Sequence, residues 1–219
     1  PAHPRLPDLE IRLAVRQRDE ATVRQAANTI VLRLDQTDPD PFCRAAEFLL
    51  GLAPDDADGI AARLLDAALT HTPGHPLAKR LRADLARTQG DSDLALALLA
   101  ELVYDHPLDI EAVAALGDCF AQTARRSELA ALLECYGPLW RDLPALRSLQ
   151  AAEREGKGDT EGAERLLETV NAESPTAATI LRLGALRRNR GDRAAALDEL
   201  ARHPEIVAAS APLLALRTA

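Results

Sequence analysis

The residue types that most often do chemistry are present in this sequence, but they form no known catalytic motif. Four of the five histidines lie at or beside the proline-marked ends of predicted helices: His71, His75, His106 and His203. A histidine near the C-terminal end of a helix interacts favourably with the helix dipole and the open carbonyls, so we expect these side chains to stabilise helix ends. The sequence has no GxSxG, HExxH, phosphate-binding loop or dinucleotide fingerprint. It therefore predicts a protein that is not an enzyme.

The cysteines and paired acids also lack the spacing of a reactive or metal-binding site. Cys43, Cys119 and Cys135 form no CxxC pair and have no histidine at metal-ligand spacing. We expect them to be buried small hydrophobic residues. The pair Asp55-Asp56 fits helix capping better than acid–base catalysis. We expect neither a metal nor another cofactor.

The densest run of charge lies within the segment RLGALRRNRGDR, residues 182–193. Its arginines form a predicted basic patch in an acidic protein: Arg187, Arg188, Arg190 and Arg193, with Arg182 at its start. Such a patch could bind a carboxylate-rich segment of a partner or a phosphate. The alternative is ion pairing within the chain, with acids such as Glu155, Glu161 and Asp198. Both interpretations stay open at this point.

Composition limits the classes of protein to which the chain can belong. Its 219 residues are 47% hydrophobic, and this content is mostly Ala and Leu, which favour helices. The net charge of −8 argues against general nucleic-acid binding. No apolar run approaches the roughly 18–20 residues of a membrane span. The start, PAHPRLPDLE, has neither Met nor signal-peptide features, so we expect a soluble piece of a longer polypeptide, cytoplasmic or periplasmic.

A period of 34 residues runs along the chain. Pro39, Pro73, Pro107 and Pro175 lie on this period, which only Arg141 breaks. Apolar columns follow the same step, and the first of them is Ala27, Ala61, Ala95, Leu129, Ala163 and Leu197. Three residues later the next column is Ile30, Leu64, Leu98, Leu132, Leu166 and Leu200. Two further columns lie four and seven residues after the first. Residues at these four spacings lie on one face of an α-helix, so the columns form one apolar stripe.

Turn residues divide each repeating unit into two helices. Gly90-Asp91, Gly158-Asp159 and Gly191-Asp192 each place a glycine where a helix can end in the left-handed conformation. The aspartate that follows can cap the next helix. The equivalent turn of the second unit runs from Pro54 through Gly59, and that of the fourth unit is Ala124-Arg125-Arg126-Ser127, a weaker turn pattern.

These 34-residue helix–turn–helix units resemble the tetratricopeptide repeat. The best match is TQGDSDLALALLAELVYDHP, residues 88–107, and the pairs Leu116-Gly117 and Leu183-Gly184 also fit. The resemblance implies an all-α fold, a right-handed α-α superhelix of antiparallel helix hairpins, in one domain over residues 1–219. Six repeats are expected, at about 6–38, 40–72, 74–106, 108–140, 142–174 and 176–203. A capping helix is expected over 205–219.

The resemblance also implies a concave groove lined by the first helix of each repeat. Carried over column by column, its residues are Arg12, Arg80, Asp84, Arg87, Asp118, Gln122, Ser148, Glu155, Arg182 and Asn189. The bland alternative is that these are solvated surface residues without a ligand. The family's clamp of Lys, Asn and Arg for a C-terminal carboxylate is absent, because only Lys79 and Lys157 occur and no Asn follows Lys79 at the required spacing.

The predicted function is a non-catalytic scaffold that binds a protein or peptide segment in its groove. The bias toward Ala, Leu and Arg suggests a bacterial source, and residues 111–133 are similar to envelope-assembly proteins. We therefore expect an assembly for envelope biogenesis, secretion or polysaccharide export. One alternative is the regulatory or substrate-docking arm of a larger enzyme, such as a glycosyltransferase. Another is a homo-oligomer that stacks through its end repeats.

Overall fold

The computed structural model describes residues 13–17, 19–31, 38–53, 56 and 59–218. Some residues that carry parts of the sequence predictions lie outside the described residues or have undescribed side chains: Arg12, Ile30, Pro54 and Asp55. The chain forms two compact units, Pro1–Cys119 and Phe120–Ala219. The single domain expected over both units stays a prediction.

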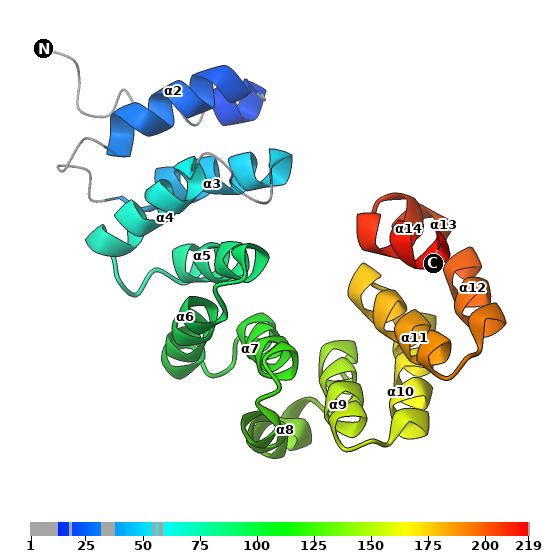
Figure 1. Cartoon of the computed structure of the whole chain (residues 1–219). Helices are drawn as coiled ribbons and strands as arrows, with labels where there is room; N and C mark the ends of the chain where they lie inside the picture. The colour runs from blue at the N-terminus through cyan, green and yellow to red at the C-terminus, as the bar shows by residue number, and fades with distance from the viewer. Residues whose placement is uncertain (1–12, 18, 32–37, 54–55, 57–58, 219) are drawn as a thin grey trace, which may run out of the picture. The chain divides into compact units, whose positions relative to one another are not determined.

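The first unit is built from helices that pack as consecutive hairpins (Figure 1). After a helical segment at 13–17 come α2 (Glu20–Val31), α3 (Asp40–Leu52), α4 (Ile60–His71), α5 (Pro76–Gln89) and α6 (Ser92–Asp105). Helix α7 (Ile110–Gln122) begins in this unit and ends in the next. Helices α3 and α4 form one hairpin, α5 and α6 form another, and α5 packs on both α3 and α4.

The second unit repeats this pattern. Its helices are α8 (Arg126–Trp140), α9 (Pro144–Gly156), α10 (Thr160–Glu173), α11 (Ala177–Asn189), α12 (Arg193–Arg202), α13 (Pro204–Ala208) and α14 (Ala211–Thr218). Helix α9 pairs with α10, α11 pairs with α12, and the contact of α10 with α11 stacks the two hairpins. All regular secondary structure of the described residues is α-helix, as the sequence predicts.

The periodic apolar columns form the core of each unit. In α4, Ala61, Leu64, Leu65 and Ala68 are fully buried. The equivalent residues of α6 and α10 are also mostly buried. The stripe is less buried in α12, where Leu197 is 37% exposed. The reason is that no full-length hairpin follows α12 in the described structure and packs against it. The predicted stripe is therefore confirmed, and it weakens where stacking partners are lacking.

The predicted turn chemistry is also confirmed. Gly90 has a left-handed backbone, with φ +81°, at the end of α5. The carboxylate of Asp91 then accepts a hydrogen bond from the Leu94 N–H at 3.1 Å. Asp159 and Asp192 cap α10 and α12 in the same manner. The glycine reverses the chain without a Cβ clash, and the aspartate satisfies an N–H group that the helix leaves open.

The C-terminal segment departs from the prediction. The single capping helix expected over 205–219 is wrong, because the described chain forms α13 and α14 with a break at Ala209–Ser210. Pro212 explains the break, since proline has no N–H to donate to the carbonyl four residues before it and its ring clashes with that carbonyl. Helix α14 still covers α11. Leu216 lies so close to Gly184 that a Cβ added there would be 2.6 Å from the leucine methyl group.

Candidate functional site

The predicted groove residues of the first unit lie on α5 and α7 and are mostly engaged with one another or with their neighbours. The guanidinium of Arg80 donates to Asp109 at 2.6 Å and also pairs with Glu111. Arg87 donates to Asp84 at 3.4 Å. Arg80 therefore ties α5 to the start of α7, and it presents no unpaired charge to a ligand.

The Asp84 carboxyl is accessible to solvent but is also partly desolvated by the surrounding protein. Its side chain is 51% exposed, yet desolvation raises the pKa of the carboxyl above its ordinary value and outweighs the opposing effects of Arg87 and Arg80. Asp118, also predicted to face the groove, is half-buried.

In the second unit, the structure brings Glu155 of α9 and Arg182 of α11 together. The Nε of Arg182 donates to the Glu155 carboxylate at 2.9 Å. Gln122 and Asn189 are exposed, and Ser148 is half-buried. Among the predicted groove residues of this unit, the pair Glu155–Arg182 is thus the one that spans two consecutive first helices, and it lies at the edge of a cavity.

This cavity has a volume of about 320 Å³ and lies between the Ala124 turn, the start of α8 and the end of α9. Its floor is apolar and consists mostly of small side chains: Phe120, Ala121, Ala124, Leu129, Ala130 and Ala152. Its charged rim consists of Arg126, Glu153, Glu155, Lys157 and Arg182. A hollow with an apolar floor and a few polar groups at its edge is the usual form of a ligand-binding site.

The rim carries one more cation than anion. Lys157 pairs with Glu153, and Arg182 pairs with Glu155. The Arg126 guanidinium has no hydrogen-bond or ion-pair partner among the residues that the structure describes. The sequence predicted Glu155 and Arg182 as site residues but missed Arg126 and Phe120. The signal that could have found Arg126 is the loss of the Gly-Asp turn pattern at 124–125.

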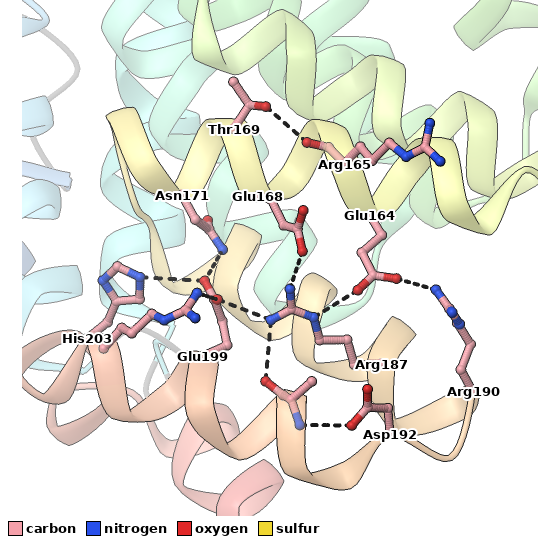
Figure 2. Close-up of polar contacts among 12 residues, drawn as sticks. Glu164, Arg165, Glu168, Thr169, Asn171, Arg187, Arg190, Asp192, Glu199 and His203 are labelled. Atoms are coloured by element: carbon pink, nitrogen blue, oxygen red, sulfur yellow. Dashed lines mark hydrogen bonds and ion pairs between the residues drawn. The ribbon is translucent and has the colours of Figure 1, made fainter.

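One arginine of the predicted basic patch, Arg187, is buried. Figure 2 shows Arg187 of α11 between helices α10 and α12, surrounded by carboxylates. It donates to Glu164 at 2.9 Å, to Glu199 at 3.2 Å and to Glu168, and the residue is only 7% exposed. Burial lowers the pKa of Arg187, but the hydrogen bonds to Glu164 and Glu168 outweigh this effect and hold the pKa above its ordinary value.

Glu199 of α12 is the most buried acid of this cluster, at 2% exposed. Besides the Arg187 hydrogen bond, its carboxylate accepts a hydrogen bond from the Asn171 side chain at 2.9 Å and one from Arg202 at 3.2 Å (Figure 2). The ring of His203 lies 3.5 Å away. A buried carboxylate is tolerated when donors surround it in this way, so the cluster joins α10, α11 and α12.

The other arginines of the patch divide between pairing and exposure. Arg190 is exposed and pairs with Glu164, and Arg188 and Arg193 are also exposed. Pairing within the chain, the alternative left open by the sequence, therefore describes Arg182, Arg187 and Arg190. Of the acids expected to take part, Glu155 does so. The acids that surround Arg187 were missed, because they come from α10 and α12 at spacings unrelated to the repeat.

Two expectations about reactive side chains need correction. His75 does not stabilise the end of α4: it is the N-cap of α5, and its Nδ1 accepts a hydrogen bond from the Ala78 N–H at 3.2 Å. Cys43 and Cys119 are buried as expected, but Cys135 is exposed, since its column on α8 faces solvent. Burial raises the pKa of the Cys43 thiol to about 11, which makes it a weak nucleophile.

The described residues contain no group of three or more histidines, cysteines or acids that could hold a metal ion. None of their helices combines the length and the apolar character that crossing a membrane would require.

The chain has the fold of known solved structures, although its sequence is distant from them. No protein-family model matches it, and no curated protein matches its sequence. A tetratricopeptide repeat protein from Parabacteroides merdae is 15% identical, with 96% of this chain and 82% of that chain covered and a TM-score of 0.76.

Two other similar structures are those of a pilus biogenesis factor and of a protein with a peptide-binding site. PilW, a type IV pilus biogenesis factor, is 16% identical, with 98% and 99% of the two chains covered and a TM-score of 0.65. YrrB, described as a tetratricopeptide protein with an unusual peptide-binding site, is 14% identical, with 84% of this chain and 94% of that chain covered and a TM-score of 0.52. Because hairpin order, turn chemistry and these similarities agree, the chain has the fold of tetratricopeptide repeat proteins.

Proposed function

We propose that this protein is a non-catalytic scaffold that binds a segment of a partner protein along the faces of its first helices. The observation that carries the proposal is the cavity of about 320 Å³ beside α9, with an apolar floor and a charged rim that includes Glu155 and Arg182. A rim of paired charges around an apolar hollow suits a peptide, which offers apolar side chains and backbone hydrogen-bonding groups together.

The proposed setting is a multi-protein assembly of the bacterial envelope. Its support is the similarity in fold to PilW, which is a factor for type IV pilus biogenesis. YrrB supports the peptide-binding part of the proposal, because that protein has an unusual peptide-binding site. The source of the chain and the identity of its partner belong to this proposal.

Site-directed photo-crosslinking tests which face binds the partner. A benzophenone amino acid is placed at Asp84 or Gln122, which are exposed on first helices. The matched controls are Ala97 and Ala131, which are exposed on the second helices α6 and α8 and lie one period apart. After irradiation in the source cell, we expect a discrete crosslinked protein from positions 84 and 122 and much less from 97 and 131. Equal crosslinking from all four positions, or none, would overturn the proposal.

A further inference from the structure

The turn between α7 and α8 differs from the other turns in ways that do not favour stability. Where the α5–α6, α9–α10 and α11–α12 hairpins have a left-handed glycine followed by a capping aspartate, this turn has Ala124 with φ +56° and Arg125 without a side-chain cap. An alanine in the left-handed region is strained, and an uncapped helix start leaves N–H groups open. The residues at this turn are therefore not explained by the folding of the hairpin.

Arg126 is held at the cavity by a close fit to α9. A Cβ built on Gly156, at the end of α9, would lie 3.4 Å from the Arg126 Nε and 3.6 Å from its Cδ. The stem of the arginine thus lies across the surface that the glycine leaves open. A Cβ at position 156 would make ordinary van der Waals contact with the arginine, so Gly156 and Arg126 lie together in the wall of the cavity.

The charge balance of the rim selects the sign of the ligand. Two of its three cations are matched by Glu153 and Glu155, and Arg126 remains without a partner among the described residues. An arginine pairs well with a carboxylate because its planar fork of N–H groups fits the two oxygens. The floor, with Phe120 and Leu129 between small alanines, offers space for an apolar side chain.

We infer that this cavity binds an internal segment of the partner in which a large apolar side chain lies one to three residues from an aspartate or glutamate. The apolar side chain occupies the floor, and the carboxylate pairs with Arg126. This inference deepens the proposed function and rests on it, since it names the chemistry of the bound segment.

Fluorescence polarisation with capped peptides tests the inference. The probes are N-acetylated, C-amidated octapeptides in which Leu or Phe is followed by Glu at one, two or three residues, each paired with its Gln counterpart. We expect at least one Glu peptide to bind about tenfold more tightly than its Gln counterpart, which corresponds to about 1.4 kcal/mol. Equal binding of every pair, or no binding by any, overturns the inference.

Three variants locate the effect. Arg126→Gln is expected to weaken the Glu peptide about tenfold and to abolish the preference for Glu over Gln. Arg125→Gln removes the same charge from the next residue, which does not line the cavity, and is expected to change binding less than twofold. Ala130→Leu fills the floor and is expected to weaken both peptides. If Arg125→Gln and Arg126→Gln act alike, the carboxylate is not bound by Arg126 and the inference is wrong.

A last set of peptides distinguishes an internal acidic residue from a C-terminal carboxylate. The crosslinking result then distinguishes failure of this inference from failure of the proposed function. The same peptides with Gln inside and a free C-terminal carboxylate are expected to bind no better than their amidated forms; binding by these alone overturns the internal-acid assignment. If crosslinking from positions 84 and 122 succeeds but Arg126→Gln leaves the crosslinked partner bound, only the inference fails. If crosslinking shows no preference for the first helices, the proposed function fails with it.

Discussion

Arg187 and Arg126 lie in the same compact unit and carry the same charge, but their surroundings are opposite. Arg187 is buried between α10 and α12 and contacts three carboxylates. Arg126 is exposed at a cavity and contacts none among the described residues. The arginine in the densest basic segment is thus structural, whereas the arginine at an irregular turn is available to a ligand.

The comparison teaches that the density of like charge along a sequence is a poor guide to a binding site. A charge that is buried must be neutralised by its neighbours, because desolvation is costly. An exposed charge that has no partner within the chain makes a favourable ion pair only when a ligand of opposite charge binds. The predictions below use this difference.

The largest expected effect is on stability. Arg187→Met should lower the free energy of unfolding by about 3–5 kcal/mol, because Glu199 and its neighbouring acids would lose their shared cation in a buried site. Arg126→Met should change it by less than about 0.5 kcal/mol, as is usual for exposed side chains. Urea denaturation followed by circular dichroism measures both. Similar losses for the two variants would remove the distinction between the arginines.

A second prediction restores the regular turn beside the cavity. The double variant Ala124→Gly/Arg125→Asp should raise the free energy of unfolding by about 1–2 kcal/mol, since it relieves the left-handed alanine and supplies an N-cap. Urea denaturation measures the gain, and the same substitutions should leave Arg126 in place for peptide binding. A loss of stability would mean that the irregular turn is required by the fold and not set aside for a ligand.

The two arginines should also respond differently to salt. Raising the NaCl concentration from about 0.05 to 0.5 M should weaken binding of the Glu octapeptide about threefold to fivefold, because the exposed pair formed by Arg126 is screened. The destabilisation caused by Arg187→Met should stay nearly constant, since buried pairs are screened much less. Polarisation and denaturation titrations at both salt concentrations test this. A salt-independent peptide affinity would argue against a charge contact at Arg126.

The smallest expected effect comes from the other end of the rim. Glu155→Gln removes the carboxylate that accepts from Arg182 and adds a second unmatched cation to the cavity. Binding of the Glu octapeptide should become about twofold to threefold tighter, as expected for partly exposed charges. Glu161→Gln, on an exposed residue of α10 outside the rim, is the control. Weaker binding in Glu155→Gln would show that the pair positions Arg182 and does not merely neutralise it.

Much of the fold could be predicted because its causes are local and recur along the chain. The columns that contain Ala61 and Leu64 are set by helical spacing, and the Gly90-Asp91 turn is set by backbone conformation and capping. The C-terminal segment was predicted less well. The effect of Pro212 on a helix is local too, but it was overlooked, and the resulting break appears only in the structure.

The candidate site was predicted only in part. Glu155 and Arg182 were expected on the same face, and they form an ion pair at the cavity. The role of Arg126 was not predicted, and for Arg187 the sequence left open whether it binds a ligand or pairs within the chain. Whether an arginine is neutralised depends on which acids neighbouring helices bring within about 4 Å of it, and the repeat period does not specify these contacts.

By itself, the sequence determined the helical period, the buried stripe and the Gly-Asp turns, because each depends on residues within one hairpin. Only the tertiary structure decided that Arg187 is enclosed by Glu164, Glu168 and Glu199, and that Arg126 lies over Gly156 at an open cavity. The physical reason is that burial and charge pairing are properties of the packed helices together, and they exist only once those helices are in contact.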